Sequence, residues 1–280
     1  MALELRHWFL VVVIWTLLAA CGIFPATALA EAVVKIGGTG SAMGAMKQLA
    51  VEYEKSYPGT NIQVLPSLGS SGGIKAVLGN GIDLAVASRP LTKSEQQQGA
   101  VAMEYAKSPF VFVTNPKIKK NDISVRELEA FYNNATSNWP DGSRIRLILR
   151  PENDSDTRLL SSISPTMEQA VKAALSRPGM IMAITDQESS EAIARIPGAL
   201  GGATLTEIIS EKLPLNVLSF NGVQPSTKTI SDGTYPLVKS LYLVTAPNSS
   251  AEAWKFIAFV RSLTGRKILT KTGNLVVELK

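Results

Sequence analysis

The sequence has almost no cysteine and almost no histidine. Cys21 and His7 are the only residues of their types among 280, and both fall within the first thirty. Because that stretch has the pattern of an export signal, the mature chain is expected to contain no disulfide, no catalytic thiol and no imidazole. Zinc sites are built mainly on those two residue types, so we expect no metal and no other cofactor.

The sequence also has no concentrated charge of one sign. Its 28 basic and 23 acidic residues give a modest formal net charge of +5 at pH 7. The densest basic cluster, Lys117, Lys119 and Lys120, is followed at once by Asp122. A nucleic-acid-binding surface needs basic residues gathered on one face with aromatic residues between them. We therefore expect no nucleic-acid partner.

Long apolar runs are missing except in residues 1–30, which we predict to be a signal peptide. The run Trp8–Ala20 has the length of a signal-peptide core and is too short to cross a bilayer alone. Ala28–Ala30 forms an A-x-A cleavage site, whereas Leu18–Cys21 resembles a bacterial lipobox in which the cysteine would carry lipid. An uncleaved anchor extending to Ala30 is a third possibility. Cleavage at either site predicts an exported protein, in the periplasm or cell envelope.

The mature chain alternates between predicted strands and helices. Strands are expected at 32–36, 62–65, 82–87 and 109–114, with helices at 42–57 and after the loop at 69–73. This β-α-β-α-β order implies a parallel sheet. Further along we expect helices after Ser124 and Ser155 and at 166–175, 188–196 and 251–263. Strands are expected at 146–149, 198–205 (with a turn at 208–209), 215–220, 235–245 and 274–278.

The stretch Leu68–Pro90 carries the clearest functional pattern. A glycine- and serine-rich turn, Gly69–Gly73, opens directly into a helix. Such a turn leaves backbone N–H groups unpaired at the positive end of the helix dipole, which is a ready anion site. The following strand delivers Ser88 and Arg89 at its carboxyl end, where open α/β sheets bind ligands.

Two other stretches share this chemistry. Gly40-Ser41-Ala42 and Ser155-Asp156-Thr157, like Ser70-Ser71, stand at predicted helix starts, and Arg150, like Arg89, ends a strand. Each serine or threonine alone could be an ordinary helix cap. Together they can supply the fixed hydroxyl, amide and guanidinium donors that a dehydrated oxyanion requires. The sequence therefore predicts a receptor for a small oxyanion.

A serine hydrolase is the alternative from a different class. Residues Gly69–Gly73 formally match the G-x-S-x-G elbow, but that elbow needs a base, normally histidine. A Ser–Lys pair with Lys75 would require the lysine to be desolvated so that its pKa falls. We therefore expect a protein without catalytic activity.

The chain resembles the phosphate-binding proteins of ABC phosphate importers, in the type II periplasmic-binding-protein superfamily. The most specific segments are GSSGGIKA and DLAVASRPL, supported by IGGTGSAMGAMKQL, RPENDSDTR, PGALGGATL and GTYPLVKSLYLVT. The resemblance implies a two-lobed α/β fold, each lobe a mostly parallel sheet flanked by helices, joined by two hinge strands. On it, lobe I comprises residues 31–114 plus 234–280 and lobe II residues 115–233, with the ligand in the cleft between them.

The resemblance also implies the ligand contacts, and the residue pattern adds Ser71 and Asp156. The candidate ligand-binding residues are Ser41, Ala42, Ser70, Ser71, Ser88, Arg89, Arg150, Ser155, Asp156 and Thr157. Ala42 could contribute only its backbone N–H.

One departure from the family pattern concerns Asp156. This chain has one residue more than the family pattern between Arg150 and Ser155, and Asp156 then stands where the family usually has glycine. An aspartate facing the site would repel an anion unless it accepts a proton from it. Phosphate can donate such a proton and sulfate cannot. Alternatively, Asp156 points away as a helix N-terminal charge with Arg158 nearby.

The resemblance implies an extracytoplasmic solute-binding protein, expected to be a monomer, that captures inorganic phosphate or a similar oxyanion. It would deliver this ligand to an ABC permease at the membrane. An envelope sensor or adaptor with the same fold and weak or no anion binding remains an alternative, as does the serine-dependent hydrolase.

Overall fold

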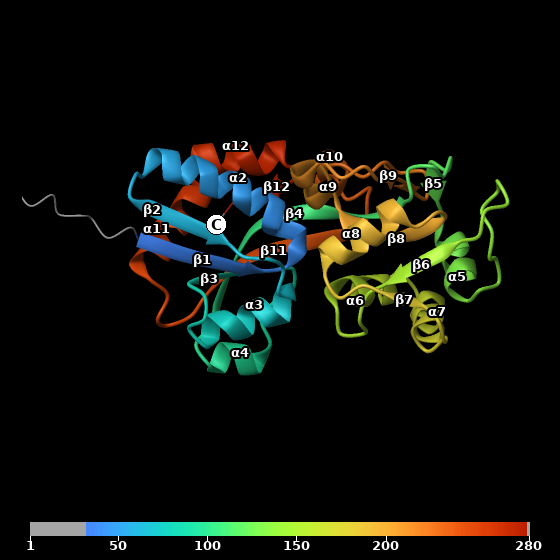
Figure 1. Cartoon of the computed structure of the whole chain (residues 1–280), viewed down its shortest axis with the longest axis horizontal. Coiled ribbons are helices and arrows are strands. Elements are labelled where there is room, and N and C mark those ends of the chain that lie inside the picture. The colour runs from blue at the N-terminus through green and yellow to red at the C-terminus, as the bar shows by residue number, and fades with distance from the viewer. Residues whose placement is uncertain (1–31, 279–280) are drawn as a thin grey trace, which may run out of the picture. The chain divides into compact units, whose positions relative to one another are not determined.

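Strands and helices alternate along most of the chain in the computed structural model, which describes residues 32–278 (Figure 1). The predicted signal peptide, Cys21 and both cleavage sites lie outside the described residues. The elements are β1 (Ala32–Gly38), α2 (Gly40–Ser56), β2 (Thr60–Val64), α3 (Gly69–Leu78), β3 (Leu84–Ala87), α4 (Lys93–Gln97), β4 (Val101–Thr114), β5 (Asp122–Ile123), α5 (Val125–Tyr132), β6 (Arg146–Leu149), α6 (Ser155–Ser161), α7 (Pro165–Leu175), β7 (Ile181–Met182), α8 (Asp186–Arg195), β8 (Ala199–Thr204), α9 (Leu205–Glu211), β9 (Asn216–Val217), β10 (Ser219–Phe220), α10 (Thr227–Ser231), β11 (Val238–Thr245), α11 (Ala251–Arg261), α12 (Leu263–Lys271) and β12 (Leu275–Val276).

The main sheet follows the order β2-β1-β3-β11-β4-β8-β6-β7. Strand β1 is parallel to both β2 and β3, and β6 is parallel to both β7 and β8. This confirms the predicted β-α-β-α-β start. The long strands β4 and β11 pair antiparallel with each other at the centre of the order. They connect the β2-β1-β3 group with the β8-β6-β7 group, as expected of two hinge strands.

Alternating side chains on the buried strands fill the space on both faces of the sheet. In β3, Leu84 and Val86 join a core around α2 and α11, whereas Ala85 and Ala87 join a second core with α3. Accordingly, α2 and α12 lie on one side of β1–β3 and α3 on the other (Figure 1).

The second half repeats this plan, because Phe110 and Phe112 pack towards α5 and α7 while Val111 and Val113 pack towards α8. Burying a large apolar side chain stabilises the fold by about 1.5–3 kcal/mol, so each half has a core of its own. The residue bounds of the two lobes stay a prediction.

Most predicted elements form close to their expected bounds, and the exceptions have local causes. Strand β4 begins at Val101 rather than at residue 109. Its first half carries polar residues on a partly exposed face, so it lacks the continuous apolar run from which the strand at 109–114 was predicted. The prediction of a strand and turn at 198–209 is wrong at its end. Thr204 caps α9 by accepting a hydrogen bond from the Glu207 N–H, so 208–209 is helical. The chain beyond Ser262 continues into α12, which we did not predict, because Ser262 caps it.

No helix within residues 32–278 is both long and apolar enough to cross a membrane.

Candidate functional site

The site is built where strands end and helices begin. Helices α2, α3 and α6 start at Gly40, Gly69 and Ser155. The prediction of a loop at 69–73 is wrong, because these residues already form the first turns of α3. Neither Thr39 before α2 nor Leu68 before α3 makes a side-chain capping bond. Apart from the Gly69 N–H, which donates to Ser67 Oγ at 3.3 Å, the first-turn N–H groups of these two helices therefore have no side-chain acceptor, which is the arrangement that attracts anions.

Two glycines allow these helix starts to approach each other. Gly38, the last residue of β1, has φ +142°, and a Cβ there would lie 1.9 Å from the Val86 carbonyl oxygen. A Cβ on Gly73 would lie 2.6 Å from the Cα of Gly38. Only glycine fits this close passage of α3 over the end of β1. The passage brings Thr39 beside Ser88, the residue that follows β3.

Four hydroxyl groups meet at this point, and we call Thr39, Ser70, Ser88 and Ser155 the hydroxyl cluster. Ser88 Oγ lies 3.0 Å from both Ser70 Oγ and Ser155 Oγ, and it donates to Thr39 Oγ1 at 3.3 Å. The Ser88 N–H donates to Ser70 Oγ at 2.9 Å. Segments separated by up to 116 positions in the sequence thus contribute donors to one place.

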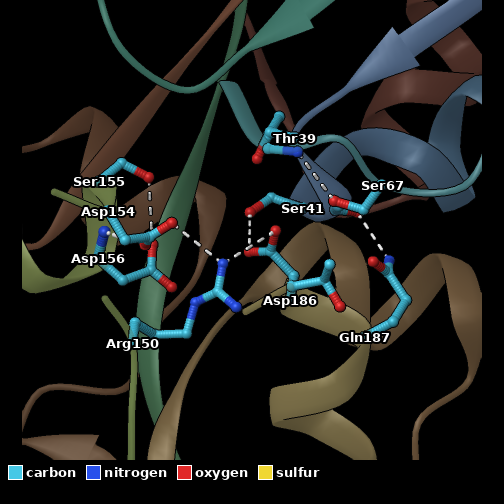
Figure 2. A network of polar contacts seen from close by, with 12 residues as sticks. Thr39, Ser41, Ser67, Arg150, Asp154, Ser155, Asp156, Asp186 and Gln187 are labelled. Carbon is cyan, nitrogen blue, oxygen red and sulfur yellow. Dashed lines mark hydrogen bonds and ion pairs between the residues drawn. The ribbon is translucent and has the colours of Figure 1, made fainter. Parts of the chain in front are cut away.

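A second group of side chains lies beside the hydroxyl cluster, and most of its members are labelled in Figure 2. We call it the charged cluster. Its members are Arg150, Asp154, Asp156, Asp186 and Lys239. The Arg150 guanidinium lies 3.0 Å from Asp154 and 3.8 Å from Asp186, and Lys239 forms an ion pair with Asp156. Apart from Asp154, these residues are at most 5% exposed.

Ser41 connects to the charged cluster across the two halves of the chain. Its hydroxyl donates to Asp186 Oδ1 at 2.8 Å and accepts from Lys239 Nζ at 3.2 Å. Asp186 begins α8. Residues from α2, α8 and β11 thus converge on one buried polar centre.

The two most buried carboxyl groups of this centre, Asp156 and Asp186, differ in pKa. Burial raises the pKa of Asp156 to about 6, against the opposing effect of Lys239. Burial also acts to raise the pKa of Asp186, but Lys239, Arg150 and the Ser41 hydrogen bond outweigh it and hold that pKa below its ordinary value. Burial acts to lower the pKa of Lys239, but the surrounding carboxylates outweigh it, so this pKa lies above its ordinary value. At neutral pH Asp186 is therefore ionised and Lys239 is protonated.

The structure brings together most residues of the predicted set. Ser70, Ser88 and Ser155 belong to the hydroxyl cluster, and Arg150 and Asp156 to the charged cluster. Thr157 Oγ1 donates to the Arg150 carbonyl at 3.1 Å, and Ala42 and Ser41 are fully buried in the first turn of α2.

Ser71 and Arg89 lie in a different network. The Arg89 guanidinium forms two hydrogen bonds with Glu95, at 2.7 and 2.9 Å, and donates to Ser71 Oγ at 3.0 Å. Glu95 is also the capping-box residue of α4. This paired arrangement holds α4 against α3, so the ligand-contact role of both residues stays a prediction.

Asp156 does not adopt the outward orientation that we considered. The residue is 3% exposed, and its side chain pairs with Lys239 rather than with Arg158. Asp154, not Asp156, caps α6 by accepting from the Asp156 N–H at 2.8 Å.

Four members of the site were not in the predicted set: Thr39, Asp154, Asp186 and Lys239. Lys239 was the one detectable signal, because it is a single charge within the otherwise apolar strand segment YPLVKSLYLVT. Asp186 follows a two-residue strand too short to recognise, and nothing local distinguishes Thr39 from other loop threonines.

Fold and site together define an α/β binding protein with anion-directed donors at its strand ends. A family model described as a PBP superfamily domain matches residues 25–262, and the chain belongs to this superfamily. The resemblance inferred from the sequence and the predicted fold class are thereby confirmed.

Individual relatives agree with this assignment. The phosphate-binding protein PstS of Borreliella burgdorferi is 29% identical over 262 residues, which cover 89% of this chain and 91% of that protein. The crystal structure of PstS from Borrelia burgdorferi is 26% identical, with a TM-score of 0.51, and covers 89% of this chain and all of that one. A phosphate ABC transporter substrate-binding protein with bound phosphate, from Clostridium perfringens, has the same fold. Its TM-score is 0.75 at 19% identity, over 88% of this chain and 100% of that chain.

Proposed function

We propose that this protein is an extracytoplasmic solute-binding protein that captures phosphate for delivery to an ABC importer. The single observation that carries the proposal is the convergence of the hydroxyl cluster, Ser41 and Arg150 at the carboxyl ends of β1, β3 and β6. The exported location follows from the predicted signal peptide and from the relatives, which are named as phosphate-binding proteins.

The donors can supply enough binding free energy to hold a small anion. Micromolar retention requires about 8 kcal/mol of net binding free energy. Hydrogen bonds to a charged partner contribute about 1.5–3 kcal/mol each. Three or four of the hydroxyl and amide donors, together with the Arg150 guanidinium, reach that sum.

Phosphate fits the charged cluster better than a fully ionised oxyanion does. Asp156 lies beside the donors, and a carboxylate next to an anion is favourable only where a proton is shared between them. Both protonation states of phosphate at neutral pH carry such a proton, whereas sulfate carries none. Phosphate, or arsenate with the same protonation, is therefore the proposed ligand.

The test is calorimetric titration of the mature domain with phosphate, arsenate, sulfate and molybdate. We expect one site for phosphate and arsenate, and weaker binding of the other two. Arg150→Ala should weaken phosphate binding by about 3 kcal/mol. Arg146→Ala, an exposed arginine on the same strand β6, is the matched control and should leave the affinity unchanged. Equal affinity in the wild type and Arg150→Ala would remove Arg150 from the site.

An envelope sensor or adaptor is a second candidate, favoured by one observation. The site donors are already engaged with each other and with three carboxylates, which is compatible with weak anion binding. Absence of binding to all four oxyanions, together with a stable complex with another envelope protein, would support this candidate.

We propose a binding role without catalysis and a monomeric state. Ser70 Oγ contacts the hydroxyl and the N–H of Ser88, and neither group is a base. Lipid attachment at Cys21 remains an alternative to cleavage after Ala30, and mass spectrometry of the exported protein would separate the two.

A further inference from the structure

Asp186 occupies a position that resembles that of a bound anion. Its carboxylate accepts a hydrogen bond from Ser41 in the first turn of the seventeen-residue helix α2. The approach is close, because a Cβ added to Gly40 would lie 2.7 Å from Asp186 Oδ2. A tethered carboxylate thus faces the uncapped N-terminus of α2, as Figure 2 shows for the Ser41 side chain.

The same carboxylate faces the two cations of the site. Arg150 Nη2 lies 3.8 Å from Asp186 Oδ2, and the Lys239 ammonium donates to the Ser41 hydroxyl that in turn donates to Asp186. Ser41 and Arg150 are among the donors that the proposed function assigns to an oxyanion. A carboxylate and an oxyanion present similar negatively charged oxygens to such donors.

The neighbouring contacts hold Asp186 in place. Gln187 donates from its side chain to the Gly40 carbonyl at 3.1 Å and to Glu211 at 3.1 Å, which joins the start of α8 to the start of α2. Asp186 is 5% exposed, and its pKa lies below the ordinary value, so it is charged throughout the neutral range.

We propose that Asp186 is a built-in competitor of the oxyanion ligand that sets the affinity of the site. Resting on the proposed function, this inference assigns a specificity-determining role to a residue outside the predicted set. The incoming anion must displace the Asp186 carboxylate from Ser41 and Arg150 or bind beside it with like-charge repulsion. Either route weakens binding relative to a site without this charge.

Asp186→Asn tests the proposal because it removes the charge and keeps the size. The asparagine oxygen can still accept from Ser41, and the amide can donate to a bound anion. Calorimetry with inorganic phosphate should show an affinity at least about tenfold higher than that of the wild type. Asp186→Ser removes the same charge with a different side chain and should change the affinity in the same direction, which covers a folding defect of either variant.

Asp141→Asn is the matched control. Asp141 is an exposed carboxylate whose described hydrogen bonds come from Ser143, so its removal changes the net charge equally without touching the site. Its phosphate affinity should stay within about twofold of the wild type at 0.15 M salt, because exposed charges are screened over such distances.

The outcomes separate the two proposals. Tighter phosphate binding by Asp186→Asn and Asp186→Ser supports the inference, including the case in which the wild type binds too weakly to measure. If the wild type binds phosphate and both variants bind it with the same or a lower affinity, the inference is overturned and the proposed function stays intact. Asp186 would then be positioning Arg150 and Lys239. Absence of phosphate binding in the wild type and both folded variants overturns both proposals.

Discussion

The hydroxyl cluster and the charged cluster lie side by side but differ in what holds them together. Thr39, Ser70, Ser88 and Ser155 are neutral groups that can act as donor or acceptor, so they can exchange partners at small cost. The charged cluster consists of buried ions, each of which needs a specific partner, because an unpaired buried charge is strongly destabilising. The comparison suggests that the hydroxyl cluster serves ligand exchange, whereas the charged cluster holds the two halves of the chain together and sets selectivity.

Removing one partner of the buried ion pair should have the largest effect. Lys239→Met leaves Asp156 without its ion-pair partner and removes one of the two cations near Asp186, since Arg150 remains. Breaking a buried pair in this way costs about 3–5 kcal/mol of unfolding free energy. Urea denaturation should show this loss, and the double variant Lys239→Met with Asp156→Leu should recover much of it. If the single variant is as stable as the wild type, the pair does not join the two halves.

Glu207, which borders the charged cluster, provides a pH-dependent test. Burial, followed by repulsion from Asp186, raises the pKa of this carboxyl group to about 8, and Ser190 donates to it at 2.7 Å. The folded state keeps the proton up to about pH 8, whereas the unfolded chain releases it near the ordinary value of 4.5. Wild-type stability should therefore fall as the pH rises between these two values.

Glu207→Gln removes this titration and retains the acceptor for Ser190. Relative to the wild type, the variant should gain about 4 kcal/mol of unfolding free energy between pH 5 and pH 9. Denaturation at both pH values measures the change. Parallel pH profiles for the two proteins would contradict the assignment.

Loss of one hydroxyl should have a smaller effect, and mainly on binding. Ser88→Ala removes the oxygen that lies within 3.0 Å of both Ser70 and Ser155. Because the remaining hydroxyls can pair with each other, we expect stability to change by less than about 1 kcal/mol. Phosphate affinity should fall by about 1–2 kcal/mol in calorimetry, whereas a larger loss of stability than of affinity would give this cluster a structural role.

Arg89→Ala should have the smallest effect on binding. The guanidinium is engaged by Glu95 and Ser71, and this pair is only partly buried, with side chains 12% and 16% exposed. We expect unchanged phosphate affinity and a loss of at most about 1 kcal/mol of stability, after allowance for solvent screening. A tenfold loss of affinity would instead place Arg89 among the ligand contacts.

The hydroxyl cluster was largely predictable because three of its four members, all except Thr39, lie in a local pattern. Ser70 and Ser155 follow strands and begin helices, and Ser88 ends a short apolar strand, so spacing alone identifies them. The family resemblance then groups them in one site.

The charged cluster was only partly predictable because its pairs join distant segments. Lys239 and Asp156 are 83 positions apart, and Ser41 and Asp186 are 145 apart, so nothing in the local sequence shows that they meet. The orientation of Asp156 depends on Lys239 in the same way. Arg89 stands at a strand end like Arg150, but its guanidinium is hydrogen-bonded to the Glu95 carboxylate, six residues further along the chain.

The most direct test of the account is a crystal structure of the mature domain grown with phosphate. We predict one phosphate ion within hydrogen-bonding distance of the Ser70 and Ser88 hydroxyls and of the Arg150 guanidinium. A phosphate ion bound elsewhere, with the hydroxyl cluster still closed on itself, would contradict the claim that these donors converge on one anion.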